Sequence, residues 1–183
     1  TGNITTPSSS SSGVTGLVTG NAVFQWTISN GTCPSSSDQV TIIHDANPSL
    51  ANAGPDQTLC SGNSSFAGNI PTTGTGFWTL ISGAGVITTP SSASSGVTGL
   101  SAGANVFQWT ISNGTCPSSS DNVIITRDPN PTIATAGPDQ TLCSSAATLG
   151  GNAPATGSGV WTTISGTGTV TSPSSNSSGV TGL

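Results

Sequence analysis

Apolar and polar residues alternate along several short stretches of this chain. The clearest case is Asn105–Asn113, in which Phe107, Trp109 and Ile111 are separated by single polar residues. Side chains point to opposite faces of a strand with a period of two, so this pattern predicts a half-buried β-strand.

A second strand is predicted downstream, where Val123 and Ile125 alternate with other residues. Asn113-Gly114 between the two strands is a turn signal. The intervening stretch Thr115–Asp121 is longer than a two-residue hairpin requires, so we expect a bulge or a wide loop there.

Five shorter segments upstream are rich in β-branched or aromatic residues and are separated by Gly, Pro and Ser. They are Gln57–Cys60, Ser64–Ala67, Gly76–Ile81, Val86–Thr88 and Gly96–Leu100. No window offers a helical apolar stripe. Seven short strands predict an all-β chain of immunoglobulin-like β-sandwiches. Disorder is the competing interpretation of so much Ser, Thr and Gly, but the strand periodicity speaks against it.

The strand pattern recurs at a fixed interval. Gly-Val-Thr-Gly-Leu begins at Gly13 and again at Gly96, which sets the period of the repeat (96 − 13 = 83), and Val23–Asp38 is identical to Val106–Asp121. A period of this length indicates one small domain copied in tandem, whose neighbours touch mainly at their ends. Such near-identity favours a mechanical role for the array.

The period divides the chain into three parts. Residues 47–129 form one complete repeat, residues 1–46 form the C-terminal part of a truncated repeat, and residues 130–183 form the N-terminal part of a further one. We therefore expect a window on a longer polypeptide. Neighbouring repeats, of the same chain or of identical chains placed head to tail, would complete the truncated domains.

Composition excludes several functions. Charged residues make up 4% of the chain, and Arg127 is the one basic residue apart from His44. Nucleic-acid binding and attachment to anionic lipid both need basic residues. The acidic residues are six Asp without any Glu, and no pair is spaced for acid–base work. We predict that the chain is not an enzyme.

Four cysteines provide candidate disulfides. We predict that Cys60 pairs with Cys116 across the two sheets, and that Cys33 and Cys143 have partners outside this sequence. The alternative is a bond from Cys33 to Cys60 across the domain junction. No Cys-x-x-Cys is present, which argues against zinc. Disulfides indicate an oxidising exterior.

The junctions between repeats hold the only candidate metal ligands, which are for calcium. The candidates are Asp45, Asn47, Asp56, Asp128, Asn130 and Asp139. Calcium takes six to eight oxygens, and two Asp and one Asn per junction are few for that. The alternative, which we favour, is that these residues form turns beside Pro and Gly, with no cofactor bound.

The aromatic and amide side chains raise two further possibilities. Trp26, Trp78, Trp109 and Trp161 would form either a sugar-stacking platform or, as their mid-strand positions favour, part of the core. Asn-x-Ser/Thr sequons make glycosylation possible. They begin at Asn3, Asn30, Asn63, Asn113 and Asn176.

An ordered set of motifs resembles a known family. The motifs are Ala-Gly-Pro-Asp-Gln-Thr-Leu-Cys at Ala53–Cys60, Gly-Phe-Trp-Thr at Gly76–Thr79, Phe-Gln-Trp-Thr-Ile-Ser-Asn-Gly-Thr-Cys at Phe107–Cys116 and Ser-Ser-Asp at Ser119–Asp121. This set resembles the PKD-like (polycystic kidney disease-like), immunoglobulin-fold tandem repeats in giant surface proteins of gliding-type Bacteroidota. The resemblance implies a β-sandwich, export across the outer membrane, and a role in adhesion, gliding or matrix. Trp109–Gly114 departs from the aromatic–Asp–Phe–Gly–Asp–Gly turn of the wider family.

These observations together predict an extracellular, cell-surface fibre or stalk built from disulfide-stapled repeats, with no membrane insertion. The alternative is an adhesin whose repeats themselves bind glycans or other surface ligands. Buried Trp and a Ser/Thr surface would favour the stalk, whereas exposed aromatics on one face would favour the adhesin.

Overall fold

The computed structural model describes residues 2–183, which form fourteen β-strands and no helix. The chain is therefore all-β, as the alternating pattern predicts. Its contacts divide it into two compact units, Thr1–Arg127 and Asp128–Leu183. The predicted division into residues 1–46, 47–129 and 130–183 stays a prediction.

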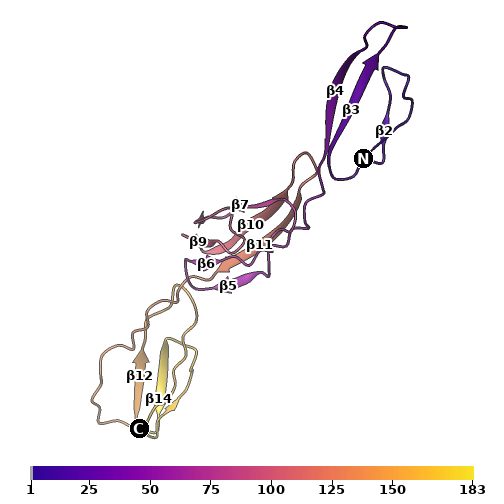
Figure 1. Ribbon diagram of the computed structural model, residues 1–183. Coiled ribbons are helices and arrows are strands. Elements are labelled where there is room, and N and C mark those ends of the chain that lie inside the picture. Colours follow the sequence, from indigo (N-terminus) through magenta and orange to yellow (C-terminus); the bar gives the residue numbers. More distant parts are fainter. Residues whose placement is uncertain (1) are drawn as a thin grey trace. The chain divides into compact units, whose positions relative to one another are not determined.

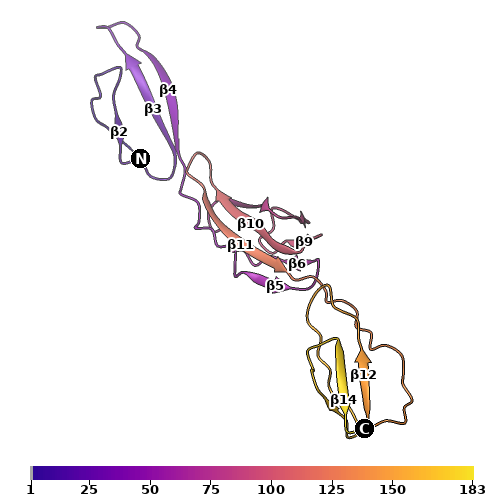
Figure 2. The same cartoon turned by 180° about the vertical axis from the view of Figure 1, so that it is seen from behind.

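The larger sheet of the complete repeat has four strands in the order β5-β11-β10-β7 (Figure 1). Strand β10 (Gly103–Ser112) is central and pairs antiparallel with both β11 (Ser119–Arg127) and β7 (Thr75–Ser82). Strand β5 (Gln57–Leu59) lies at the other edge of β11 and runs parallel to it (Figure 2). This parallel pairing places the residues after β5 beside the C-terminal end of β11.

A second, smaller sheet has the order β6-β9-β8. Its strands are β6 (Ser64–Ser65), β9 (Gly96–Thr98) and β8 (Val86–Ile87), and all pairs are antiparallel. Every one of the seven strands predicted for the complete repeat is confirmed, with ends that differ by a few residues.

Side chains from both sheets of the complete repeat meet in one core. The alternation in β10 is confirmed, because Phe107, Trp109 and Ile111 are each 0% exposed. The Trp78 ring lies between two aromatic neighbours, with its centroid 4.1 Å from that of Phe66 and 5.0 Å from that of Trp109. The remaining core residues are Ala53, Val97, Leu100, Val123 and Ile125.

Strand β11 begins at Ser119, so the predicted loop Thr115–Asp121 is too long at its C-terminal end. The segment before β5 explains the earlier start. Ser119 Oγ accepts a hydrogen bond from the backbone N of Ala51 (2.9 Å), and Asp121 Oδ2 accepts one from the backbone N of Ala53 (2.8 Å). These two contacts span 68 residues of sequence, so no local pattern reveals them.

Asn105 is a fully buried polar residue that the sequence pattern does not single out. Its Oδ1 accepts hydrogen bonds from Ala84 N and Ser101 Oγ, at 2.9 and 2.7 Å. Its Nδ2 donates to backbone carbonyls, including that of Ile125 at 3.2 Å. The amide thereby joins β10, β11 and the loop before β8 at one corner of the domain.

The N-terminal part of the first unit contains two hairpins. Strands β3 (Gly20–Ile28) and β4 (Ser36–His44) pair antiparallel over their whole length, and β1 (Asn3–Ile4) pairs with β2 (Val14–Thr15). A shift by one period converts the β3–β4 register into that of β10–β11: Gly20 opposes His44 just as Gly103 opposes Arg127.

The second unit consists of one three-stranded sheet and its loops. The strand order is β12-β14-β13, with bounds Ala146–Gly150, Ser177–Thr181 and Thr169–Val170. Local hydrogen bonds reproduce those of the complete repeat. Trp161 N donates to Pro173 O at 2.8 Å, as Trp78 N does to Pro90 O.

Replacing Asn105 with Ala should destabilise the complete repeat by about 3 kcal/mol, because it leaves several buried polar groups without partners. Hydrogen exchange of the β10 and β11 amides would measure the loss. Gln108→Ala is the control, since the Gln108–Asn122 hydrogen bond is exposed and its loss should cost about 0.5 kcal/mol or less. Equal effects of the two variants would contradict the role given to Asn105.

Candidate assembly interface

The β3–β4 hairpin carries an apolar face that is open to solvent, although the same sequence is buried in the complete repeat. We call this face, formed by Trp26, Ile28 and Val40, the open hairpin face. Trp26 is 42% exposed and its equivalent Trp109 is 0% exposed. Ile28 and Val40 are 62% and 58% exposed, whereas their equivalents are 0% and 1% exposed.

This difference reflects the lack of counterparts of β5, β6 and β7 beside β3 and β4 among the described residues. In the complete repeat, β10 and β11 are flanked by β7, which carries Trp78, and by β5, and Phe66 after β6 packs in the same core. Within the first unit, the residues described from Gly2 onward align with Gly85 and later positions of the complete repeat, so none of those before β3 is a counterpart of β5, β6 or β7. A cavity of about 340 Å³ lies against Phe24 and Trp26 instead.

The second unit lacks the opposite half of the repeat. Residues 130–183 correspond to residues 47–100, so they contain the segments that correspond to β5, β6 and β7 but no counterpart of β10 or β11. The segments 140–142 and 158–165, equivalent to β5 and β7, are therefore not strands. A strand needs a neighbour to satisfy its backbone groups, and here that neighbour is missing.

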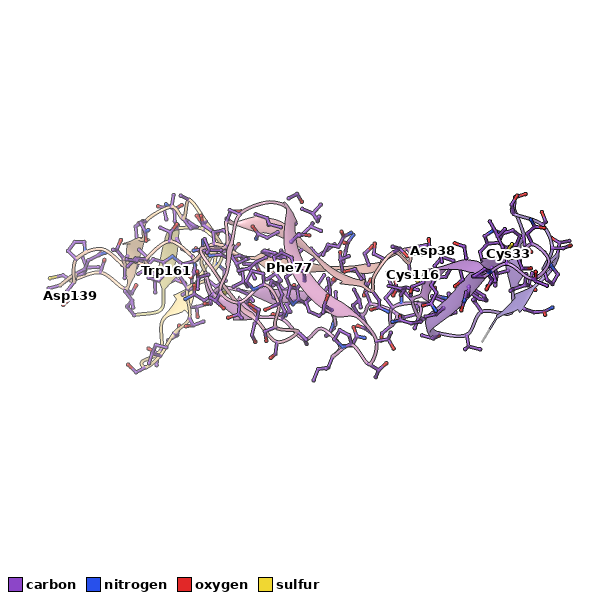
Figure 3. The ribbon with its side chains drawn as sticks, turned by 45° about the horizontal axis from the view of Figure 1, so that its top comes forward. Cys33, Asp38, Phe77, Cys116, Asp139 and Trp161 are labelled. Carbon is purple, nitrogen blue, oxygen red and sulfur yellow. The ribbon has the colours of Figure 1, made fainter. Side chains whose placement is uncertain are left out.

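Two cavities in the second unit lie where β10 side chains lie in the complete repeat. The first, of about 460 Å³, is lined by Trp161, Gly151 and Gly159. Their equivalents surround Trp109. The second, of about 480 Å³, is lined by residues that include Leu149 and Gly168, whose equivalents Phe66 and Gly85 contact Phe107. Trp161 is half-buried, and its side chain is labelled in Figure 3.

One glycine shows how closely the missing tryptophan fits. A Cβ on Gly76 would overlap the Trp109 ring, whereas a Cβ on the equivalent Gly159 would meet nothing within 4 Å. Gly76 keeps β7 close to the indole ring of β10. The second unit thus holds a slot for a tryptophan that this unit does not itself supply.

The first unit also contains a joint between β4 and the complete repeat. Asp45 Oδ2 accepts hydrogen bonds from Thr115 N (2.9 Å) and Thr115 Oγ1 (3.4 Å). Asn113 Nδ2 donates to Ala46 O at 2.8 Å, and Cys116 Sγ donates to Asp45 O at 3.4 Å. The β10–β11 turn is thereby held against the residues that follow β4.

The predicted Cys60–Cys116 disulfide is wrong. Cys33, Cys60, Cys116 and Cys143 are all free thiols. Cys60 directly follows Leu59, which opposes Arg127 at the C-terminal end of β11, whereas Cys116 precedes Ser119 at the N-terminal end of that strand. Eight residue steps of about 3.3 Å separate these ends by roughly 26 Å. The alternative bond from Cys33 to Cys60 is not formed either.

The calcium candidates Asp45 and Asp56 act on the backbone. Asp45 caps the Thr115 turn, and Asp56 Oδ1 accepts a hydrogen bond from Ile124 N at 2.8 Å. Within residues 2–183, no group of three or more His, Cys, Asp or Glu side chains converges. Both contacts join residues at least 68 positions apart in the sequence, so the local turn interpretation of these residues stays a prediction. Asn47, Asp128, Asn130 and Asp139 are exposed.

The other candidate residues divide between core and surface. Trp78 and Trp109 are core residues, whereas Trp26 lies on the open hairpin face. Four of the sequon asparagines are exposed or partly so, namely Asn3, Asn30, Asn63 and Asn176. The fifth, Asn113, is half-buried by its contact with Ala46. Sequence reasoning missed the open faces, and comparing which segments each truncated repeat lacks would have revealed them.

No family model matches the chain, and no curated protein matches it significantly. In the part of the chain that the structure describes, no helix is long and apolar enough to cross a membrane.

Two equivalent tryptophans give a matched test of the exposure difference. At a concentration where the chain is monomeric, Trp109→Ala should destabilise the complete repeat by about 3–5 kcal/mol, the usual cost of truncating a buried aromatic. Trp26→Ala should cost less than about 1 kcal/mol in the same conditions, because its ring is already partly hydrated. Hydrogen exchange resolved by segment measures both, and a large loss from Trp26→Ala alone would contradict the assigned exposure.

Proposed function

We propose that this chain is a length of extracellular structural fibre or stalk, built from tandem immunoglobulin-like β-sandwiches that are completed by further copies of the same repeat. The observation that carries the proposal is the contrast between identical sequences: Trp109 is buried and Trp26 is exposed. The open hairpin face lacks counterparts of β5, β6 and β7, and residues 130–183 contain the segments that correspond to those strands.

The sandwich assignment rests on the complete repeat. Four strands form one sheet and three form another, and both contribute to the core around Trp78 and Trp109. Seven strands in two antiparallel layers around a buried Trp are typical of an immunoglobulin-like fold. The parallel β5–β11 pair is the exception to the antiparallel pattern.

The partner of the open hairpin face is the Trp161 side of a neighbouring repeat, in the same chain or in an identical one. Inserting Trp26 beside Trp161 would recreate the Trp109–Trp78 contact, and Gly159 leaves the space that Gly76 leaves in the complete repeat. Burying Trp26, Ile28 and Val40 contributes about 1.5–3 kcal/mol for each side chain. The new strand pairs along β3 and β4 add backbone hydrogen bonds to this.

One segment is present twice in such an arrangement. Residues 1–17 and 167–183 both correspond to residues 84–100, and a completed domain has room for one of them. Strand β14 pairs with β12 over five residues, whereas β2 pairs only with β1, over two. We expect residues 167–183 to stay in place and residues 1–17 to be displaced.

The surface of the chain suits an extracellular fibre. Charged residues are 4% of the total, and Arg127 is the single site for trypsin-like cleavage, since the chain has no Lys. Of the aromatic residues in the complete repeat, all described, Phe77 alone is exposed. A glycan-binding adhesin would need more aromatic surface than that, so the stalk is favoured.

Electron microscopy of the assembled protein tests the fibre directly. We expect straight filaments with an axial repeat of about 40 Å, since a repeat spans strands of about ten residues at ~3.3 Å per residue. Separate globular particles at high concentration would refute the fibre.

Deleting residues 1–17 should strengthen association between chains, because the redundant segment no longer competes for its place on the sheet. Sedimentation velocity should show larger species at a given concentration than for the full chain. Unchanged or weaker association would contradict completion by a second copy.

Gly159→Val should abolish association while leaving each chain folded, because the new side chain would occupy the slot for Trp26. Thr148→Val is the matched control, since Thr148 and its equivalent Ser65 are both exposed and Thr148 lines neither cavity of this unit. The control should associate like the original chain. Association by both variants alike would place the contact elsewhere.

A further inference from the structure

The free cysteines occupy two different kinds of position in the repeat. Cys116 lies in the β10–β11 turn, and its Sγ is 3.4 Å from Asp45 O. Asp45 immediately follows His44, the last residue of β4. The turn cysteine of one repeat therefore lies beside the end of the last strand of the repeat before it.

Cys60 lies at the other end of its own repeat. The parallel register places Leu59 opposite Arg127, the last residue of β11. Cys60 is one residue further along the chain and is exposed. The cysteine of the Leu-Cys segment thus lies beside the C-terminal end of the last strand of its repeat, where the linker to the next repeat begins.

The equivalence of β4 and β11 brings these two positions together. His44 and Arg127 occupy the same register position, opposite Gly20 and Gly103. In the repeat that contains β4, the counterpart of Cys60 would therefore end beside His44, next to the Asp45 carbonyl that Cys116 contacts. Bridged cysteines have Cα atoms about 4.4–6.8 Å apart, a spacing that neighbouring positions meet and the two ends of β11 do not.

We propose that a disulfide crosses each joint between successive repeats, from the Leu-Cys cysteine of one repeat to the Asn-Gly-Thr-Cys turn cysteine of the next. This proposal rests on the tandem arrangement proposed above. In a continuous array the period fixes the sequence separation of the bonded cysteines (116 + 83 − 60 = 139). Each repeat would be tied to both neighbours, and none would carry a disulfide of its own.

The same rule assigns partners to all four cysteines. In copies placed head to tail, Cys60 bonds to Cys33 of the next copy, and Cys143 bonds to Cys116 of the next copy. No two cysteines within one copy have the required sequence separation. A single copy therefore contains no pair of cysteines that this rule would join.

The chemistry is thiol–disulfide exchange with an oxidising disulfide, supplied by an oxidoreductase or by a small-molecule disulfide. One cysteine thiolate attacks the oxidant and forms a mixed disulfide, releasing one thiol. The second cysteine thiolate then attacks the first cysteine's sulfur and releases the other thiol. Two protein thiols lose two protons and two electrons, and the oxidant becomes two thiols.

Peptide mapping under non-reducing conditions tests the pairing in the protein treated with oxidised glutathione. The four cysteines are distinguishable, because Ser61-Gly62-Asn63 follows Cys60 and Ser144-Ser145-Ala146 follows Cys143. Asp38-Gln39 and Asp121-Asn122 likewise distinguish the peptides of Cys33 and Cys116. We expect Cys60–Cys33 and Cys143–Cys116 peptides. A Cys60–Cys116 peptide, or random pairing, would overturn the proposal.

Two double variants separate this register from random crosslinking. Cys33→Ser with Cys60→Ser keeps Cys116 and Cys143 and should retain covalent dimers on a non-reducing gel. Cys60→Ser with Cys116→Ser keeps Cys33 and Cys143, which never share a joint, and should lose those dimers. Each variant retains one cysteine of each kind, so equal dimer yields would refute the assignment.

A chain in which a second copy of residues 18–183 follows Leu183 separates this proposal from fibre formation. It contains two whole joints in one polypeptide, so bonding does not depend on association. We expect Cys60 bonded to the second copy's Cys33, and Cys143 bonded to the second copy's Cys116. Free thiols here would overturn the disulfide even if filaments form. These bonds in a protein that never forms filaments would leave the disulfide standing and refute the fibre.

Discussion

The contact between Trp78 and Trp109 is the interaction on which the complete repeat depends. One ring belongs to β7 and the other to the central strand β10 of the same sheet, and their centroids lie 5.0 Å apart in the buried core. Phe66, Phe107 and Ile111 pack around this pair. Because each ring comes from a different half of the repeat, the core exists only where both halves are present.

The two truncated repeats show what each half does alone. The β3–β4 hairpin keeps the register of β10–β11, because its two strands pair with each other. It exposes Trp26, because burial of this side chain depends on residues of the other half. Residues 130–183 keep the β12–β14 pairing but lose the counterparts of β5 and β7, because those strands pair only with the missing half. Local hydrogen bonds therefore survive truncation, whereas strands and burial that depend on the other half do not.

The joint at Asp45 connects the end of one repeat to the β10–β11 turn of the next. The Thr115 turn is held by the Asp45 carboxylate, and a Cβ on Gly114 would overlap that carboxylate. A Cβ on Gly31, its equivalent in the β3–β4 turn, would meet nothing within 4 Å. A proposed fibre of such repeats would gain its stiffness from contacts that recur at each boundary.

The sequence by itself determined the strands, their alternating faces and the period of the repeat, because these follow from local periodicity and from repetition. It also indicated the core role of Trp78 and Trp109. Only the tertiary structure decided the start of β11, the buried Asn105 corner and the separation of Cys60 from Cys116. Each of these depends on which strands pair, and the decisive contacts join segments that are distant in the sequence. The parallel pairing of β5 with β11 carries Cys60 to the far end of the domain, and no spacing of cysteines in the sequence reveals that direction.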